Sequence, residues 1–142
     1  STLTEEESNA AIDRWTKSID EFGYGFGAAE LKETGEFVGV IGLFFPTRFV
    51  MPFSPDGVEI GWRLAQPFWG RGLATEGGRA CVEYGFEQLN RDKLFAVTAL
   101  ENSPSRKVME RLGLHDTQQD FDHPALAPDH ALARHCLYEI AR

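Results

Sequence analysis

The chain has 142 residues and a formal net charge of −8, with 14 lysines and arginines against 22 aspartates and glutamates. This length predicts a single domain, residues 1–142, large enough to bury roughly two thirds of the surface that its unfolded chain would expose. With 42% hydrophobic and 25% charged residues, the composition is that of a soluble globular protein and excludes disordered, collagen-like and coiled-coil chains. The acidic balance argues against broad nucleic-acid binding, which depends on clustered lysine and arginine.

The sequence shows neither a membrane-spanning segment nor a secretion signal. Its longest apolar run, residues 40–45, contains Gly42 and is far shorter than the roughly 18 residues of a membrane span. Residues 1–8 are polar and acidic, whereas a signal peptide opens with basic and then apolar residues. Cys81 and Cys136 lie far apart and are expected to be buried thiols of a reducing, cytoplasmic compartment.

The first third of the chain predicts a helix followed by two strands. Thr4 and Glu7 have the spacing of a capping box. Apolar residues then recur at helical spacing between residues 12 and 22, and a glycine follows as the stop. Two strand-like runs, residues 24–32 and 37–45, are joined by a glycine-bearing turn that is typical of a hairpin.

The rest of the chain predicts strands and helices in alternation. Residues 58–64 alternate apolar and polar side chains with the period of a strand that has two distinct faces. The further elements expected are, in order, a helix at 73–89, a strand at 94–100, a helix at 103–112, an irregular loop at 116–129 and a strand at 135–140. Because strands and helices alternate only here, we expect a mixed sheet with helices on both faces.

The strongest chemical signal is the segment 66–76, between a predicted strand and a predicted helix. Such a junction leaves the first helical N–H groups without intrahelical acceptors, and the helix dipole adds partial positive charge. Gly70 and Gly72 permit a sharp turn and the close approach of an oxyanion, and Arg71 adds a cation. The segment lacks the ending of a P-loop, and Thr75 breaks the dinucleotide fingerprint. It predicts a pyrophosphate cradle, with a plain strand-to-helix turn as the alternative.

Two blocks of sequence point to one family. The first is VEIGWRL at residues 58–64 with WGRGLATE at 69–76, and the second is NSPSRKVMERLGL at 102–114. The first resembles the acyl-CoA signature of the GNAT superfamily of N-acetyltransferases. Its residues are most similar to the form of that signature in the RimJ/RimL-like branch. The second resembles that branch's N-x-x-S…L-G-F motif, with Leu114 in place of phenylalanine. The resemblance covers nearly all of the chain.

The resemblance implies the GNAT fold, which is an α+β, three-layer architecture. Its mixed, mostly antiparallel twisted sheet carries helices on both faces. The family usually opens with a strand and a helix that precede the first helix predicted here, and we expect this chain to lack both. In relatives that opening region helps to wall the acceptor site. Trp69 stands where the family's general pattern has glutamine or arginine.

The resemblance also implies acetyl-CoA as the cosubstrate, and no metal. The strand 58–64 would splay from its neighbour 94–100, and the pantetheine arm would enter the gap like an added strand. The histidines are spread too widely for a zinc site. The residues implied to bind the cofactor are Trp62, Arg63, Leu64, Trp69, Gly70, Arg71, Gly72, Leu73, Ala74, Thr75, Asn102, Ser105 and Arg106.

The implied chemistry is direct attack by a neutral amine on the thioester, which requires a base, oxyanion donors and a proton source for the thiolate. Glu59 matches the strand carboxylate that acts as base through a water in many family members. Its apolar neighbours in sequence would raise its pKa toward the value that a base needs. The alternative is a structural ion pair with Arg63, on the same face of the strand.

Asn102 and Ser105 complete the predicted catalytic set. Asn102 is expected to cap a helix, and the resemblance adds a hydrogen bond to the pantetheine arm. Ser105 matches the serine with which the branch protonates the leaving thiolate, and a plain hydroxyl at a helix start is the alternative. Many other family members use a tyrosine where this chain has Met109, which cannot donate a proton. Arg106 and Lys107 are either phosphate ligands or part of a solvated face.

The leading hypothesis is an acetyl-CoA-dependent N-acetyltransferase that acts on a primary amine, a protein N-terminus or a small molecule, in a ternary complex. The alternative is a non-catalytic GNAT-fold module that binds CoA or a protein partner. The negative net charge slightly favours a cationic acceptor. No nucleic-acid or membrane partner is expected. Dimers are common in the family, so a homodimer is a candidate assembly.

Two features of the sequence each have two interpretations. His123, in the predicted loop near the C-terminus, either contacts the acceptor or bonds its own neighbours. The proline-interrupted stretch with Phe45, Phe49, Met51 and Phe53 either covers the core or forms a pocket wall or subunit contact.

Overall fold

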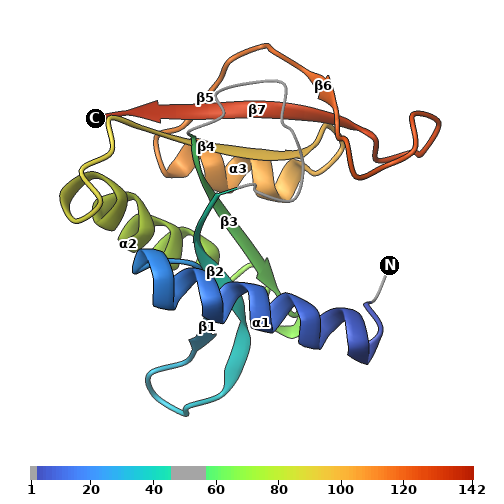
Figure 1. Cartoon of the computed structure of the whole chain (residues 1–142). Coiled ribbons are helices and arrows are strands. Elements are labelled where there is room, and N and C mark those ends of the chain that lie inside the picture. Colours follow the sequence, from blue (N-terminus) through green and yellow to red (C-terminus); the bar gives the residue numbers. More distant parts are fainter. Residues whose placement is uncertain (1–2, 46–56) are drawn as a thin grey trace.

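A computed structural model describes residues 3–45 and 57–142 of the chain. Phe49, Met51 and Phe53 of the apolar stretch lie outside the described residues. The elements are α1 (Glu5–Phe22), β1 (Phe26–Glu30), β2 (Phe37–Phe44), β3 (Val58–Leu64), the short 3₁₀ helix η1 (Gln66–Phe68), α2 (Leu73–Glu87), β4 (Lys93–Ala99), α3 (Ser103–Arg111), β5 (His115–Asp116), β6 (Phe121–Asp122) and β7 (Arg134–Ala141) (Figure 1).

Helix α1 begins and ends at the predicted residues. The Thr4 hydroxyl accepts a hydrogen bond from the Glu7 N–H at 3.2 Å, and the Glu7 carboxylate accepts one from the Thr4 N–H at 2.8 Å. Gly23 ends the helix with φ at 78°, a left-handed conformation that favours glycine. The capping box and the stop are both confirmed.

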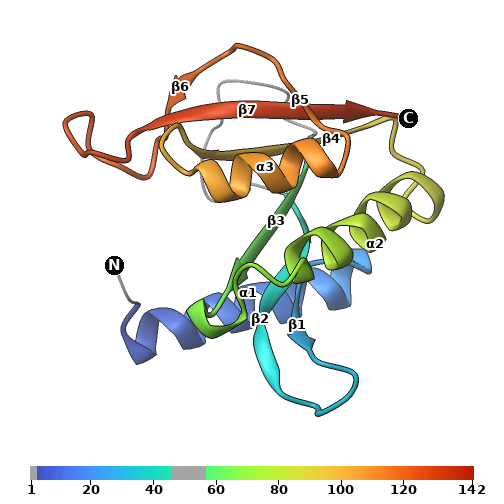
Figure 2. The ribbon, with the colours of Figure 1, turned by 180° about the vertical axis from the view of Figure 1, so that it is seen from behind.

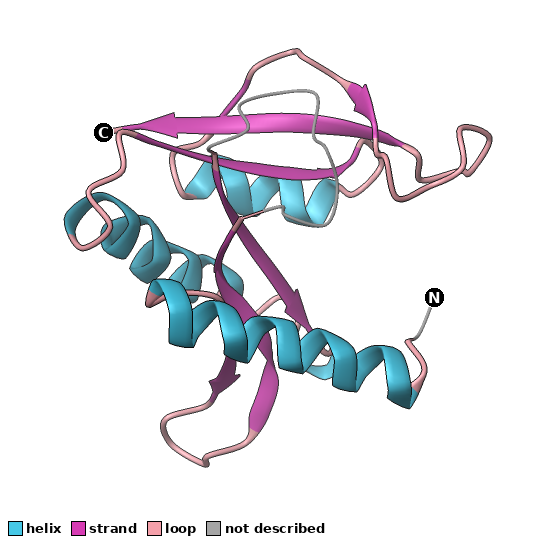
Figure 3. Cartoon of the chain, viewed as in Figure 1, coloured by secondary structure: helices cyan, strands magenta, loops and turns pink. Residues whose placement is uncertain are grey.

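The described strands form one mixed sheet in the order β1-β2-β3-β4-β7-β5, and β6 also pairs with β7. Every pairing is antiparallel except that of β3 with β4. Helix α1 lies on one face of the sheet, and α2 and α3 lie on the other (Figures 1 and 2). Figure 3 shows the helices in cyan and the strands in magenta. The expected mixed, mostly antiparallel fold with helices on both faces is confirmed.

The main core lies between the sheet and helices α2 and α3. Its most buried members include Val58, Ile60, Leu94 and Met109, each exposing at most 2% of its surface. Glycines bring α2 close to this core: a Cβ built on Gly85 would lie 2.8 Å from the Leu94 side chain. This close packing fixes where α2 begins relative to β3 and β4.

Strands β3 and β4 separate soon after they begin. Their parallel pairing consists of Val58 with Leu94 and Glu59 with Phe95. Beyond Glu59, β3 stays paired with β2 and β4 stays paired with β7, so the two halves of the sheet diverge (Figure 2). The predicted splay is confirmed, and it leaves an unpaired edge of β3 facing an unpaired edge of β4.

The C-terminal segment is more regular than the sequence indicates. Residues 116–129 were expected to form an irregular loop, but β5 and β6 pair there along the outer edge of β7. Each contains only two residues. Two residues are too few to show the apolar-polar alternation by which a strand is predicted from sequence.

Candidate active site

A cleft of about 880 Å³ opens where β3 and β4 separate. Its walls come from β3, η1, the start of α2, the end of β4 and the start of α3. It reaches both faces of the sheet, because its lining includes Trp15 of α1 as well as Thr75 of α2 and Ser105 of α3. Most of the predicted site residues are therefore brought together in one place.

The start of α2 presents free backbone donors to this cleft. Gly70 and Gly72 have φ of 73° and 74°, and a Cβ built on either would meet no atom within 4 Å. The first bond of the helix runs from the Glu76 N–H to the Gly72 carbonyl at 3.0 Å. Within the described residues, the N–H groups of residues 70–75 have no acceptor. This is the arrangement that binds a phosphate or carboxylate.

Thr75 adds an unsatisfied group beside these donors. Its hydroxyl is buried, lines the cleft and has no hydrogen-bond partner among the described residues. A buried hydroxyl without a partner costs about 1–3 kcal/mol, so a polar ligand atom at this position would relieve that cost. The residues present at the start of α2 therefore fit a pyrophosphate group.

The backbone of β3 alternates between its two edges. The Ala65 N–H donates to the Val38 carbonyl at 2.9 Å, and in an antiparallel pair such bonds recur at every second residue. The backbone groups of Arg63 therefore face β2, whereas those of Trp62 and Leu64 face the cleft. The expectation that the Arg63 backbone pairs with a pantetheine arm is wrong, because that edge is already occupied by β2.

Trp69, at the edge of the cleft, forms one side-chain hydrogen bond to β3. Its indole N–H donates to the Leu64 carbonyl at 2.8 Å, while 64% of its surface stays exposed. The Leu64 carbonyl thus already accepts one hydrogen bond. On this edge of β3, the backbone N–H and carbonyl of Trp62 are therefore the groups most available to a ligand.

Charge in the cleft differs from charge on the whole protein. Among the described residues, its charged lining consists of Arg63, Lys107 and Arg111 with one carboxylate, Glu59. Against a net charge of −8 for the chain, this local excess of cations favours an anionic ligand. Arg71 does not line the cleft, and its guanidinium lies 5.8 Å from the centroid of the Phe68 ring.

Glu59 is the last residue of β3 before the strands part. It exposes 8% of its surface and lies opposite Phe44 on β2 and Phe95 on β4. Burial raises the pKa of Glu59 from 4.5 to about 8. Among the described residues its carboxylate forms no ion pair, so the alternative of a structural pair with Arg63 is not observed. A buried carboxylate that ionises near neutral pH has the property required of a general base.

Comparison with known proteins agrees with this site. Residues 1–115 match the family model described as an acetyltransferase (GNAT) domain. The chain belongs to the GNAT family. The expected RimJ/RimL-like branch is confirmed with it.

Individual proteins resemble this GNAT chain in sequence, and solved structures resemble it in fold. It is 38% identical over 98 residues to YkkB, an uncharacterized protein of Bacillus subtilis, covering 68% of this chain and 55% of YkkB. It is 35% identical over 126 residues to the FsC-acetyl coenzyme A-N(2)-transacetylase of Aspergillus fumigatus, covering 84% and 52% of the two chains. A GnaT-family acetyltransferase structure from Bordetella pertussis superposes with a TM-score of 0.81 at 29% identity, covering 98% and 78%. The chain spans about half the length of the curated relatives it matches.

The start of α3 brings two further GNAT motif residues to the cleft. The Asn102 side-chain carbonyl accepts from the Ser105 N–H at 3.3 Å, and its amide donates to the Thr98 hydroxyl at 3.0 Å. The predicted cap is confirmed. The Ser105 hydroxyl lines the cleft and has no hydrogen-bond partner among the described residues, which leaves it available to a ligand.

Arg106 lies away from the cleft, contrary to the expectation that it binds the cofactor. Its guanidinium donates to the Tyr138 hydroxyl and the Leu100 carbonyl, each at 3.2 Å, and pairs with Asp116 at 3.4 Å. These bonds tie α3 to β5 and β7. The neighbouring Lys107 lines the cleft instead, because successive helical residues point about 100° apart.

His123 is placed outside the cleft lining as well. Its ring nitrogen Nδ1 accepts from the Ala125 N–H at 3.1 Å, and its ring lies 4.7 Å from that of His135. In the described part of the chain no group of histidine, cysteine and acidic side chains is arranged to hold a metal. No helix there is long and apolar enough to cross a bilayer.

Sequence reasoning missed the aromatic wall on the α1 side of the cleft. Trp15, Phe26 and Phe44 all line it. Each lies within a predicted helix or strand, where an aromatic residue is ordinarily part of a core. Only the register of β1 with β2 and of β2 with β3, together with the contact between the Trp15 and Phe26 rings, shows that they meet beside Glu59.

The buried Glu59 carboxyl predicts a pH-dependent stability. Because its folded pKa is raised, the native state binds more protons than the unfolded state between about pH 4.5 and 8, and stability falls as pH rises through that range. Glu59→Gln should leave the free energy of unfolding nearly unchanged near pH 4 and increase it at pH 8.5, on the order of 5 kcal/mol at most. Urea unfolding of both proteins at the two pH values measures this. An equal difference at both pH values would contradict the assignment.

Proposed function

We propose that this chain is an acetyl-CoA-dependent N-acetyltransferase that transfers the acetyl group to a primary amine by direct attack in a ternary complex. The observation that carries the proposal is the position of Glu59. A buried, unpaired carboxylate ends the β3–β4 pairing inside the same cleft that receives the free N–H groups of α2. A base and an anion-binding site thus share one cavity.

The carrier would lie along backbone groups. The N–H groups of residues 70–75 and the Thr75 hydroxyl would hold its pyrophosphate. The cleft-facing edge at Trp62 would hydrogen-bond the pantetheine arm as a strand edge binds a peptide. Membership of the GNAT family and the name of the Aspergillus relative, an acetyl coenzyme A transacetylase, both support this carrier.

The protein's own groups then supply the proton transfers. Acetyl-CoA, when bound, provides the activated thioester. Glu59 in its ionised form accepts the proton that the ammonium of the acceptor must lose, through an intervening water. As the new N–C bond forms and the C–S bond breaks, the Ser105 hydroxyl donates a proton to the departing sulfur. It takes back in exchange the second proton that the acylated nitrogen loses as it becomes an amide. Glu59 returns its proton to solvent.

Ser105→Ala tests the second transfer. Losing the hydroxyl should lower kcat by roughly 10- to 100-fold, because proton-transfer assistance is worth about this much, while CoA affinity stays the same. Steady-state kinetics and calorimetry measure the two effects. Ser8→Ala, which removes the hydroxyl of a half-buried serine of α1 that does not line the cleft, is the matched control. Equal rates in both variants would remove Ser105 from the mechanism.

The overall proposal is tested by CoA-thiol release from acetyl-CoA with a panel of primary amines, with CoA binding followed in parallel by calorimetry. Amine-dependent release that is lost in Glu59→Gln is the expected result. Tight CoA binding without release, unaltered by the same substitution, would instead identify a non-catalytic CoA-binding module. Met109, where other family members have a donor tyrosine, gives that alternative its basis.

A further inference from the structure

The face of β3 that looks toward α1 carries Glu59, Gly61 and Arg63, because alternate residues of a strand share a face. Their partners across β2 are Phe44, Gly42 and Val40. The same register places Phe26 of β1 opposite Gly42. Two adjacent glycines therefore leave a flat area in the middle of this face, between the carboxylate and the guanidinium.

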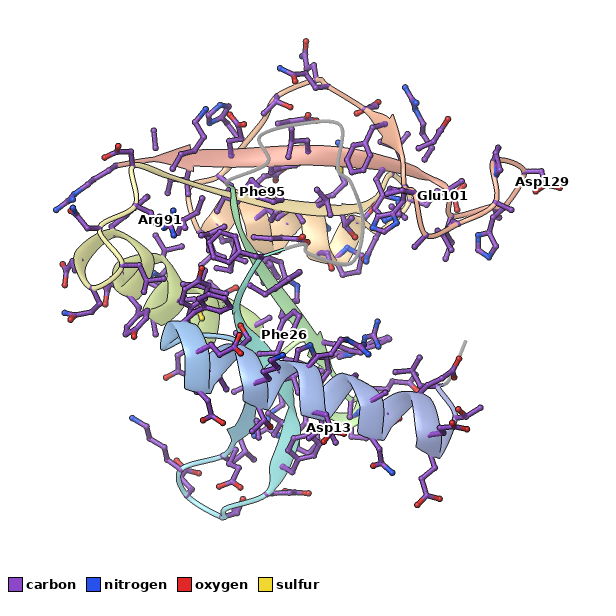
Figure 4. All side chains as sticks on the ribbon, viewed as in Figure 1. Asp13, Phe26, Arg91, Phe95, Glu101 and Asp129 are labelled. Carbon is purple, nitrogen blue, oxygen red and sulfur yellow. The ribbon has the colours of Figure 1, made fainter. Side chains whose placement is uncertain are left out.

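Three aromatic side chains fill that area. A Cβ built on Gly61 would lie 2.8 Å from the Phe26 ring and 3.1 Å from the Phe44 ring, so both rings lie over the glycine. The Phe26 and Phe44 ring centroids are 4.5 Å apart, and Trp15 of α1 meets Phe26 edge-on at 5.2 Å. Figure 4 shows Phe26 beside α1. Trp15, Phe26 and Phe44, which we call the aromatic floor, all line the cleft.

Two ionisable groups, Glu59 and Arg63, lie at the two ends of the aromatic floor. Arg63 lies four positions after Glu59, so their Cα atoms lie about 13 Å apart along the strand. The Arg63 side chain is exposed and forms no ion pair among the described residues. The other lining cations, Lys107 and Arg111, come from α3 on the opposite face of the sheet. Along the aromatic floor the described lining thus offers one carboxyl and one guanidinium.

Resting on the proposed function, we propose that the acceptor is an amine with a flat apolar body and an anionic group. The amine lies at Glu59, the body lies on the aromatic floor, and the anionic group pairs with Arg63. A polyamine would bring its second cation toward Arg63 and would find no second carboxylate among the described lining residues. This proposal replaces the cationic acceptor that the net charge of the chain suggests.

Arg63 is better placed for an acceptor than for the carrier. Trp62 and Thr75, beside the proposed pantetheine and pyrophosphate positions, belong to the α2 face of the sheet, where a Cβ on Gly77 of α2 would meet Ile41, the partner of Trp62. Arg63 projects from the opposite face. Its side chain therefore leaves β3 on the α1 side of the cleft, whereas the start of α2 lies on the other side.

A panel of four amines tests each part of the proposal. The dipeptide Gly-Phe has an amine, an aromatic body and a carboxylate. Its two residues span about 7 Å, and the long Arg63 side chain would cover the remaining distance between Glu59 and Arg63. Gly-Phe amide removes the anionic group, Gly-Gly removes the aromatic body, and spermidine is a polycation. We expect kcat/KM for Gly-Phe to exceed that for Gly-Phe amide and for Gly-Gly by about tenfold each, with spermidine lowest. Equal values for Gly-Phe and its amide, or for Gly-Phe and Gly-Gly, would overturn the proposal.

Arg63→Gln provides the matched variant. It should abolish the preference for Gly-Phe over its amide, mainly through KM, and leave CoA affinity unchanged by calorimetry. Arg79→Gln, which removes an exposed arginine of α2 that does not line the cleft, should retain the preference. If Arg63→Gln weakens CoA binding and keeps the preference, Arg63 serves the carrier and the proposal is wrong.

Binding without turnover separates this inference from the proposed function. Saturation-transfer NMR of Gly-Phe and Gly-Phe amide with the CoA-bound protein reports acceptor binding directly. Selective, Arg63-dependent binding of Gly-Phe with no release of CoA thiol from any amine would refute the acetyltransferase and sustain the acceptor site. Release with every amine, without selectivity between Gly-Phe and its amide, would sustain the acetyltransferase and refute the acceptor site.

Discussion

Glu59→Gln is expected to lower kcat for acetyl transfer by roughly 10²–10⁴-fold, the range lost when a general base is removed. Glu59 is the one carboxylate among the described residues that line the cleft, so no neighbouring acid is placed to take over. Glutamine keeps the size and shape of the protonated side chain but cannot accept a proton. CoA affinity should therefore change little, which calorimetry measures independently of the rate.

The pH profile distinguishes a base from a merely structural Glu59. With a pKa of about 8, the carboxylate is protonated below neutrality and cannot act, so kcat/KM of the unmodified protein should rise with pH and level off above 8. The residual activity of Glu59→Gln should lack this rise. Glu59→Asp is the matched control, since it keeps an ionisable group and should keep a pH-dependent rise at a reduced rate. A rise that persists in Glu59→Gln would assign the titration to another group.

The parts of the fold that follow from neighbouring residues could be predicted from the sequence. The capping box at Thr4 and Glu7 and the left-handed Gly23 set the ends of α1 through bonds within a few residues. Strand β3 has its predicted bounds because its alternation spans the whole element. In both places the local pattern and the tertiary packing favour the same structure.

The sequence could not predict which way individual side chains and backbone groups face. Ser105, Arg106 and Lys107 are three consecutive polar residues at a helix start, and nothing in their order indicates which face turns to the cleft. The Tyr138 and Asp116 groups that hold Arg106 come from distant strands. The Arg63 backbone was placed at the wrong edge of β3 for the same reason, because the register with β2 decides which residues face the gap.

Gly72→Val should reduce CoA affinity by at least about 100-fold, to the point where binding is hard to detect by calorimetry. Gly72 caps α2 with φ at 74°, and the space that its side chain would enter is open. That space lies at the free N–H groups of residues 70–75, so valine methyl groups would occupy the position of the pyrophosphate. The left-handed backbone adds a strain of about 1–2 kcal/mol for a residue with a Cβ, which alone would lower stability and not binding.

Gly35→Val separates these two effects. Gly35 has φ at 71° in the turn between β1 and β2, a Cβ there would also meet nothing within 4 Å, and the residue does not line the cleft. Both variants should therefore lose a similar part of their thermal stability, because both place a β-branched residue in the same backbone conformation. Only Gly72→Val should lose CoA binding. Equal CoA affinity in the two variants would show that the start of α2 does not hold the pyrophosphate, and the base at Glu59 would then need a different partner in the cleft.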